Sequence, residues 1–340
     1  MIQNTRILPH HRRRQPHHPG GVPDQPGKDL RTTIRDLTRK EESVRLLTAG
    51  LHIGDTYEVE RYLGQGAYSE VYRVRHRFLG RQAMKVFKRV GTLAQTRRML
   101  EEAILLSKLG HPNVVRVFDA GTVTTAAGNR GFFTMEYVAA GNLDDYRRSR
   151  PGRGANIDDA VEIVRQICAG VAVAHREQPP IVHRDLTPWN VLVGDEPHGL
   201  RVRVGDFGLA RRVDARSGLA GSEGTLAFMA PEALRFGQGA SPAADVYAIG
   251  ALAYLLLTDV LPYAETAVTV FGARHRPPPI SPHDLNHDVD QHLAQAVLHA
   301  LERHPADRPA DAAELADVLT AWCARRRADA APAPDRGLMS

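Results

Sequence analysis

The sequence predicts an α+β protein of two lobes, in which a small antiparallel sheet precedes a larger, mainly helical part. From Tyr57 onwards, apolar and polar residues alternate over successive stretches, which is typical of strands with one buried face. After Asn142, apolar residues instead recur at helical spacing over most of the chain. With 340 residues, of which 43% are hydrophobic, the chain is long enough to bury a core in each lobe.

The first 28 residues, 1–28, form a basic tail rich in His, Pro and Gly. Five Lys or Arg residues and one Asp fall in this stretch, so it carries nearly all of the net charge of +5. Such a composition does not bury enough apolar surface to fold, so we expect a disordered tail rather than an anion-binding arm or a histidine metal site. The rest of the chain is close to neutral, and we expect no nucleic-acid partner.

Residues 29–53 are predicted to be an amphipathic helix followed by a linker. The helix, over residues 29–48, is predicted by apolar residues at near-helical spacing. These residues are Leu30, Ile34, Leu37, Val44 and Leu47. We expect their apolar face to pack on the domain that follows, and docking to a partner is the alternative.

The folded domain is predicted to span residues 54–322, with a sheet lobe over about 54–138 and a helical lobe over about 139–322. In the first lobe the segment "RRMLEEAILLSKL" is expected to be a helix, and the alternating segments are expected to be strands. The strand segments are "YEVERYLGQGAYSEVYRVRHR", "QAMKVFKRV", "VVRVFDAGTV" and "GFFTMEYV". In the second lobe, short strands are expected only around two Asp-containing loops.

Neither a membrane segment nor a disulfide framework is predicted. The longest apolar stretch, residues 246–261, contains Asp259 and is shorter than the roughly 20 residues of a membrane span, so we expect a buried helix. The two cysteines, Cys168 and Cys323, and the lack of a signal-peptide pattern suggest the cytoplasm. We expect Cys168 to be a buried apolar residue, and residues 323–340 to be a disordered tail.

Residue types that handle phosphate occur along this domain in one order. A glycine turn in "GQGAYSEV" (64–71) lets backbone amides approach an anion, although such a turn alone is weak evidence. Lys85, Glu102, "HRDLTPWN" (183–190), "DFG" (206–208), "GTLAFMAPE" (224–232), Asp245 and Arg308 follow. In this order, they resemble the protein kinase superfamily, and more closely the bacterial serine/threonine kinases related to the eukaryotic (Hanks-type) ones. The resemblance implies a bilobal protein kinase fold.

The resemblance also implies how the catalytic residues act. Asp185 would accept the proton of a Ser or Thr hydroxyl, and Asn190 and Asp206 would hold Mg²⁺, or Mn²⁺ in its place. Lys85 would neutralise the α- and β-phosphates of ATP, and Glu102 would hold Lys85 in place. The implied catalytic set is Asp185, Lys85, Glu102, Asn190, Asp206 and Thr187.

An ATP site is implied between the two lobes. Its residues would be Leu63, Gly64, Gly66, Val71, Ala83, Lys85, Met135, Glu136, Val138, Asn142 and Leu192. Met135 would lie at the back of the adenine pocket, and the backbones of Glu136 and Val138 would hydrogen-bond the adenine edge. Val71, Ala83 and Leu192 would enclose the ring. His183 is expected to pack under Phe207 rather than to act on a proton.

Several positions depart from the family pattern. Thr187 and Trp189 leave the catalytic loop without the cation that most kinases place on the transferring phosphate, and losing one such donor typically costs about 10²–10³ in rate. We therefore expect an active but slow or compensated enzyme. Ser69 replaces the third glycine of the turn, Asn142 stands where many kinases have an acid for the ribose, and Phe228 replaces a tyrosine.

Control by phosphorylation is expected in the activation segment, between "DFG" and "APE". Arg184 is a cation next to the catalytic Asp185, and kinases with this Arg are often switched on by a phosphate. We favour Ser222 as the acceptor, with Ser217 second, because Thr225 is expected to hydrogen-bond Asp185. The reaction would then be autophosphorylation, for which a homodimer is a possible arrangement.

Two other classes of protein share parts of this pattern. A pseudokinase that binds nucleotide and serves as a signalling scaffold usually lacks a metal-binding or proton-accepting residue, and none is missing here. Small-molecule kinases share the spacing from Asp185 to Asn190 but generally lack "APE" and its paired Arg. We expect Glu232 and Arg308 to form that ion pair, so protein substrates are favoured.

Overall fold

The protein divides into two units, Met1–Arg45 and Leu46–Ser340, of which the second holds nearly all the residues described below. The computed structural model describes residues 45–66, 68–89, 100–126, 128–149, 156–197, 199–207, 226–233, 241–263 and 277–330. The predicted tail, residues 1–28, and most of the predicted helix after it lie outside these residues.

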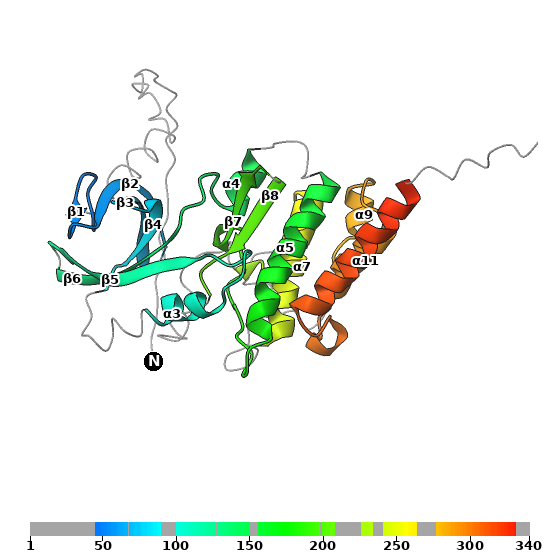
Figure 1. The fold of residues 1–340 in the computed structure, drawn as a ribbon. Helices are drawn as coiled ribbons and strands as arrows, with labels where there is room; N and C mark the ends of the chain where they lie inside the picture. Colours follow the sequence, from blue (N-terminus) through cyan, green and yellow to red (C-terminus); the bar gives the residue numbers. More distant parts are fainter. Residues whose placement is uncertain are drawn as a thin grey trace, which may run out of the picture. The chain divides into compact units, whose positions relative to one another are not determined.

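The N-terminal lobe is built on an antiparallel sheet with strand order β1-β2-β3-β4-β6-β5 (Figure 1). The strands are β1 (His52–Ile53), β2 (Tyr57–Gln65), β3 (Ser69–His76), β4 (Gly80–Phe87), β5 (Val117–Thr125) and β6 (Gly128–Glu136). The helix α3 (Glu101–Lys108) connects β4 to β5 and packs against β5. The predicted strands and helix are therefore confirmed, and only the short β1 was not expected.

The two faces of this sheet differ in what they carry. Side chains alternate along each strand, and residues paired across strands share a face. Val71 pairs with Lys85, and Tyr72 pairs with Met84. The inner face carries Val71, Ala83 and Lys85. The outer face carries Glu70, Tyr72, Val74, Met84 and Val86, and its apolar members belong to one buried cluster with Leu47 and Phe132.

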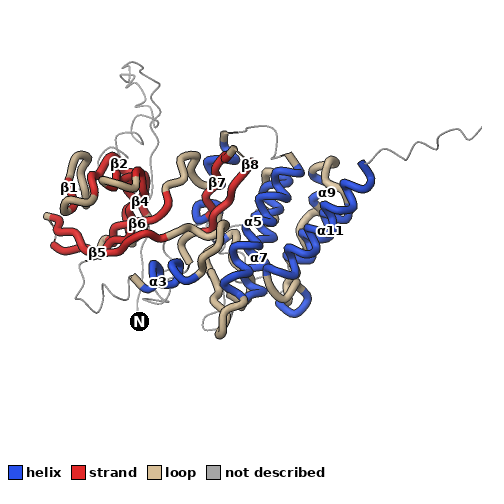
Figure 2. Tube along the Cα trace, viewed as in Figure 1, coloured by secondary structure: helices blue, strands red, loops and turns tan. Residues whose placement is uncertain are grey.

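The C-terminal lobe is mainly helical (Figure 2). Its elements are α4 (Leu143–Arg148), α5 (Ile157–His175), η1 (Pro188–Asn190), β7 (Val191–Glu196), β8 (Gly199–Val204), α7 (Pro242–Thr258), α9 (Pro282–Leu285), α10 (Gln291–Ala300), η4 (Pro305–Asp307) and α11 (Ala312–Ala330). The hairpin β7–β8 is the pair of short strands that the sequence predicts. The α+β fold of two lobes is thus confirmed.

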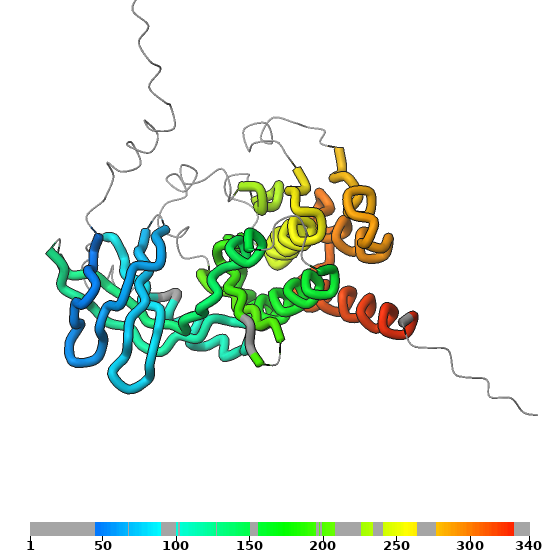
Figure 3. Tube along the Cα trace, turned by 90° about the horizontal axis from the view of Figure 1, so that it is seen from above, coloured from blue at the N-terminus to red at the C-terminus, as the bar shows by residue number. Residues whose placement is uncertain are grey.

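The helix α7 is the centre of the C-terminal core. Its residues from Ala243 to Leu257 are all buried, because α5, α10 and α11 pack around it (Figure 3). The Ser241 side chain caps its first turn by accepting from the amide of Ala244 at 3.3 Å, and Pro242 follows, as is common in a first turn. The apolar stretch 246–261 is therefore mostly a buried helix, as predicted, and no helix in the described ranges is long and apolar enough to cross a bilayer.

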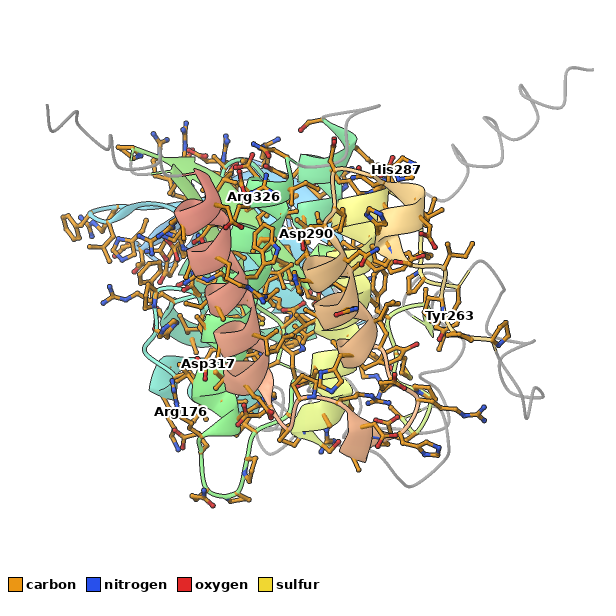
Figure 4. The ribbon with its side chains drawn as sticks, turned by 90° about the vertical axis from the view of Figure 1, so that its right-hand side faces the viewer. Arg176, Tyr263, His287, Asp290, Asp317 and Arg326 are labelled. Carbon is orange, nitrogen blue, oxygen red and sulfur yellow. The ribbon has the colours of Figure 1, made fainter. Side chains whose placement is uncertain are left out.

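The last helix is longer than the sequence predicts. The tail was expected to begin at residue 323, but α11 continues to Ala330. Two contacts hold this part: Trp322 Nε1 donates to Asp290 Oδ2 at 2.5 Å, and Arg326 Nε lies 3.0 Å from Asp158 Oδ1 (Figure 4, in which Asp290 and Arg326 are labelled). Alanine and arginine are also strong helix formers, so the segment does not need a wide apolar face to stay helical.

The start of the described chain also differs from the prediction. Residues 45–48, the end of the predicted helix 29–48, are not helical. The apolar side chain of Leu47 is instead buried in the outer-face cluster, with 2% of its surface exposed. Side chains of the sheet bind the amides of Leu46 and Leu47, and these contacts compete with helical hydrogen bonds.

Candidate active site

Lys85 and Asp206 meet where the two lobes join. Lys85 lies on the inner face of β4, and its Nζ atom donates to Asp206 Oδ1 at 2.6 Å. Only 9% of the Lys85 side chain is exposed, whereas 44% of the Asp206 side chain is. The buried ammonium is therefore neutralised by a carboxylate that remains open to solvent on one side.

The catalytic loop holds Asp185 by contacts within the loop itself. Asn190 Nδ2 donates to the backbone oxygen of Asp185 at 2.7 Å and to its Oδ2 atom at 3.1 Å. The short helix η1 sets this geometry, since Asn190 N donates to Thr187 O at 3.1 Å. The amide of Asn190 thereby orients one oxygen of the Asp185 carboxylate.

Asp245, near the start of α7, fixes the backbone before the catalytic residue. Its carboxylate accepts from the amides of His183 at 2.7 Å and Arg184 at 2.9 Å, and it lies 2.9 Å from His175 Nε2. The carboxylate is buried, and such a group is costly unless it is hydrogen-bonded in this way. The loop is therefore attached to α7, the helix at the centre of the C-terminal core.

Arg184 and Asp206 both have left-handed backbone conformations. Their φ angles are 68° and 55°, in a region that residues other than glycine seldom adopt. Each such residue typically costs about 1–3 kcal/mol and persists only where the surroundings impose it. For Arg184, the bond from its amide to Asp245 is one such constraint.

His183 supports the strand that leads to Asp206. Its ring is fully buried, contacts the Phe207 ring with centroids 4.5 Å apart, and lies 2.8 Å from the backbone oxygen of Gly205. The predicted packing role of His183 is confirmed. Gly208 lies outside the described residues, as does the remainder of the activation segment up to residue 225.

Some of the residues predicted to bind nucleotide lie on the inner face of the sheet near Lys85. Val71, Ala83 and Lys85 share the inner face, Ala83 pairs with Met135 on β6, and the backbones of Leu192 and Asn142 form a bridge. The remaining predicted residues are Leu63 and Gly64 on β2, Gly66 in the following turn, and Glu136 and Val138 at the end of β6 and just beyond it. Their contact with a nucleotide stays a prediction.

The segment between the lobes has anchors that the sequence did not indicate. Glu136 Oε2 lies 2.6 Å from Arg203 Nε on β8, and Arg61 Nη2 donates to the Tyr137 hydroxyl at 3.2 Å. Burial raises the pKa of Tyr137, but the hydrogen bonds from Arg61 and Arg73 outweigh it, so the pKa is lowered. These are contacts between distant charged residues, which no local sequence pattern reveals.

Asn142 has a structural task that the sequence did not predict. Its side-chain oxygen caps α4 by accepting from Asp145 N at 2.9 Å, and Asp145 Oδ2 accepts from the amide of Asn142 at 3.2 Å. This reciprocal pair is a capping box. A contact of Asn142 with ribose would therefore use its side-chain NH₂ group.

Thr187 and Trp189 differ in accessibility. Thr187 is 2% exposed, so neighbouring atoms cover its side chain, whereas Trp189 is 45% exposed. Neither residue carries a charge, and no Lys or Arg stands between Asp185 and Asn190 in the sequence. The indole of Trp189 is free to contact another molecule at its surface.

Glu232 and Arg308 form the predicted ion pair. The two bonds join Arg308 Nη1 to Glu232 Oε1 at 2.7 Å and Arg308 Nη2 to Glu232 Oε2 at 2.9 Å. Arg308 also donates to the backbone oxygens of Ala243, Glu302 and Arg303. The end of "APE" is therefore attached to the loop before α11.

For Glu102, the structure describes the backbone in α3 but not the side chain, so its contact with Lys85 stays a prediction.

A lobe with a glycine turn, a buried lysine that meets an aspartate, and an Asp–Asn catalytic loop together define the protein kinase class. In agreement, the family model for the protein kinase domain matches residues 57–329. The chain belongs to the protein kinase family.

Curated bacterial kinases are similar to the chain over most of its length. It is 33% identical to serine/threonine-protein kinase pkn3 of Myxococcus xanthus over 83% of its own residues and 53% of that protein. It is 34% identical to the DNA damage-responsive serine/threonine-protein kinase RqkA of Deinococcus radiodurans, over 83% of the chain and 41% of that protein. The chain thus spans about half the length of these relatives or less.

Solved structures agree with the fold. The crystal structure of the Mycobacterium tuberculosis PknI kinase domain matches with a TM-score of 0.60 and 26% identity, over 81% of the chain and 99% of that domain. The chain therefore matches nearly the whole of that kinase domain.

Proposed function

We propose that the protein transfers the γ-phosphate of ATP to Ser and Thr hydroxyls of proteins, with Mg²⁺ as cofactor and with its own activation segment as one substrate. The observation that carries this proposal is the 2.6 Å contact between Lys85 Nζ and Asp206 Oδ1 beside the ordered loop of Asp185 and Asn190. These groups come from distant parts of the sequence, and phosphoryl transfer needs all of them. The names of the bacterial relatives support the choice of Ser and Thr.

The residues fit a magnesium ion that is shared with a substrate. Asn190 Nδ2 is used by Asp185, so the side-chain oxygen of Asn190 is the atom left for a metal, and the Asp206 carboxylate is partly exposed. Mg²⁺ prefers oxygen ligands and is often held by one or two carboxylates plus phosphates. When bound there, Mg²⁺ would neutralise charge on the phosphates.

Asp185 and Lys85 have separate tasks in this proposal. Asn190 holds one carboxylate oxygen of Asp185, which leaves the other to accept the proton of the attacking hydroxyl. Lys85 supplies a positive charge for the α- and β-phosphates, in a buried position where electrostatic interactions are stronger than in water. Since no cation stands at Thr187, we expect the transfer itself to be slow.

Protein substrates are supported by the ion pair of Glu232 and Arg308. It fixes the chain directly after the activation segment, which in protein kinases lies next to the substrate. Small-molecule kinases generally lack this pair. Trans-autophosphorylation would need two copies of the chain, so a transient homodimer is part of the proposal. The proposal includes neither nucleic acid nor a membrane as a partner, and it places the protein in the cytoplasm.

The proposal is tested by incubating the protein with labelled ATP and Mg²⁺ and comparing it with Lys85→Met, Asp185→Asn and Asp206→Asn. We expect phosphate on Ser or Thr only in the wild type and in two matched controls, Lys108→Met and Asp317→Asn, whose side chains are exposed elsewhere. Circular dichroism confirms that each variant is folded. Equal incorporation in all variants, or none in any of them, would contradict the enzyme and leave the nucleotide-binding scaffold.

A further inference from the structure

Two buried side chains of β3 hold the backbone of Leu46 and Leu47 on the outer face of the sheet. Glu70 Oε2 accepts from Leu46 N at 3.1 Å, and the Tyr72 hydroxyl accepts from Leu47 N at 3.0 Å. The same Tyr72 hydroxyl donates to Glu70 Oε2. Glu70 is 4% exposed, Tyr72 is 1% exposed and Leu47 is 2% exposed. We call these four residues the N-terminal latch.

The latch joins the kinase domain to residues that precede it. The family match begins at residue 57, yet Leu47 belongs to the buried cluster of the outer face. The chain between these points also pairs with β2, since Gly50 N donates to Val59 O at 2.8 Å and Val59 N donates to Leu51 O at 2.9 Å. The outer layer of the lobe is therefore completed by a segment outside the matched domain.

The burial of Glu70 is explained by this segment. A carboxylate without partners is costly to bury, so a buried Glu needs donors in fixed positions. Glu70 has two, the Leu46 amide and the Tyr72 hydroxyl. Burial, followed by the bond to Glu70, raises the pKa of Tyr72, so its hydroxyl remains a donor at neutral pH. Without the Leu46 amide, Glu70 would lose one of these two bonds.

The same strand positions the nucleotide side of the sheet. Val71 lies between Glu70 and Tyr72 in sequence and faces inward opposite Lys85. Glu70 also pairs with Gln65, next to the glycine turn. A side chain added at Gly64, near the end of β2, would meet nothing within 4 Å, so no side chain packs against this position. The turn is held by the pairing of β2 with β3 and by Lys88, whose Nζ donates to Gln65 Oε1 at 2.8 Å and to Gly66 O at 2.9 Å.

We propose that the N-terminal latch is a positioning element of the nucleotide site, in which docked Leu46 and Leu47 keep β3 and the glycine turn in the geometry that binds ATP. This inference rests on the proposed function. An apparent dissociation constant rises as the population of the binding geometry falls. Any event that pulls Leu46 and Leu47 off the sheet would therefore weaken nucleotide binding.

The test uses the full chain and variants of the two latch side chains. Tyr72→Phe removes the acceptor for Leu47 and the donor to Glu70, and Glu70→Ala removes the acceptor for Leu46. Glu70→Gln keeps a side-chain oxygen and is the conservative variant that should restore function. The matched controls are Glu58→Gln and Arg75→Gln. They break an ion pair between β2 and β3 in which 58% of the Arg75 side chain is exposed.

Binding of Mg·ADP is measured by calorimetry, together with hydrogen exchange at Gly64, Gln65 and Gly66. We expect Tyr72→Phe and Glu70→Ala to weaken binding about 2- to 10-fold, as one or two buried hydrogen bonds can, and to speed exchange in the turn. We expect kcat at saturating ATP to change by less than about twofold, because the latch acts on binding. Glu70→Gln and the controls should resemble the wild type.

Different results would contradict the latch and the proposed enzyme. Folded latch variants that bind Mg·ADP as well as the wild type would overturn the latch, even if their melting temperatures were lower. A wild type that binds Mg·ADP but transfers no phosphate would contradict the proposed enzyme and leave the latch to be judged on the binding data. A wild type that binds no nucleotide would overturn both.

Discussion

Arg308 places both terminal nitrogens of its guanidinium on the two oxygens of Glu232, at 2.7 and 2.9 Å. The Arg308 side chain is fully buried, and 17% of the Glu232 side chain is exposed. The two bonds to Glu232, the contact with the Tyr247 ring at 5.0 Å and the three backbone oxygens suit a planar guanidinium with several donors. The pair ties two segments of the C-terminal lobe together.

Replacing Arg308 should destabilise the protein strongly. We expect Arg308→Ala to lower the free energy of unfolding by about 3–5 kcal/mol, because it leaves a largely buried carboxylate without its partner. Arg308→Lys should recover only part of the loss, since an ammonium cannot form both bonds. Urea unfolding measures this, with Arg81→Lys as the control, because 60% of the Arg81 side chain is exposed in its ion pair with Glu60. A loss below about 1 kcal/mol, the range of exposed pairs, would contradict the prediction.

Restoring a cation at Thr187 should speed the reaction. We expect Thr187→Lys to raise kcat by more than it changes the KM for ATP, because the contact would form as charge develops on the transferring phosphate. Steady-state kinetics with a peptide substrate measures both constants. Since Thr187 is 2% exposed, a melting curve must show that the longer side chain is accommodated. An unchanged or lower kcat in a folded variant would show that the loop is compensated elsewhere.

Trp189 should influence which peptides are accepted. Kinases that prefer arginine near the acceptor often carry a glutamate at this position, whereas the indole of Trp189 is 45% exposed and uncharged. We expect the wild type to favour apolar or uncharged neighbours, and Trp189→Glu to shift the preference towards arginine without a change in ATP affinity. A peptide array measures the profile. A wild-type profile dominated by arginine would contradict this.

Phosphorylation of the activation segment should raise activity. Ser217 and Ser222 lie outside the described residues, and the prediction rests on Arg184, an exposed cation next to the catalytic Asp185. We expect the double variant Ser217→Ala, Ser222→Ala to lose activity, and Ser222→Ala to account for most of the loss. Mass spectrometry locates the phosphate and a peptide assay measures the rate. Full activity of the double variant would contradict a phosphate switch.

Asp290 should make the C-terminal lobe sensitive to acid. Burial raises the pKa of its carboxyl, but hydrogen bonds from Leu293 N, Trp322 Nε1 and His292 N outweigh this effect, and the pKa falls below the ordinary 3.8. A carboxyl with a lowered folded-state pKa stabilises the protein above its unfolded-state pKa, and this contribution is lost as the pH falls through the folded-state value.

Asp290→Asn isolates that contribution, since asparagine is an equally good cap for α10. We expect the variant to be about 1 kcal/mol less stable near neutral pH, because charged hydrogen bonds are stronger than neutral ones. The difference from the wild type should shrink below about pH 4, where the carboxyl of the unfolded chain is protonated. Urea unfolding at several pH values measures it. A difference that is constant with pH would contradict the assignment.

Much of this fold could be predicted because its signals are local. The alternation in β2 and β3 indicates one buried face per strand, and the apolar run of α7 indicates a helix that is buried all round. The two wrong predictions, for the start of the described chain and for the end of α11, have a physical cause. Leu47 has helical spacing but is held by side chains far along the chain, and α11 continues past Trp322 through distant contacts with Asp290 and Asp158.

The site was predicted by the order of its motifs more than by local pattern. Asp185, Asn190 and Asp206 could be placed by resemblance, and the structure joins Asn190 to Asp185 and Lys85 to Asp206. The supporting contacts could not be predicted in the same way. Glu70 looks like a solvent-facing residue in an alternating strand, and its burial becomes visible only when Leu46 is placed above it.

The carboxylate of Asp245 receives the amides of His183 and Arg184, so the catalytic loop has no stability separate from that of α7. Structural units that share such buried bonds open together. On heating, the catalytic loop should therefore not lose its structure before α7 unfolds. A half-inactivated sample would then be a mixture of fully competent and fully unfolded molecules, not a uniform population of weakened ones.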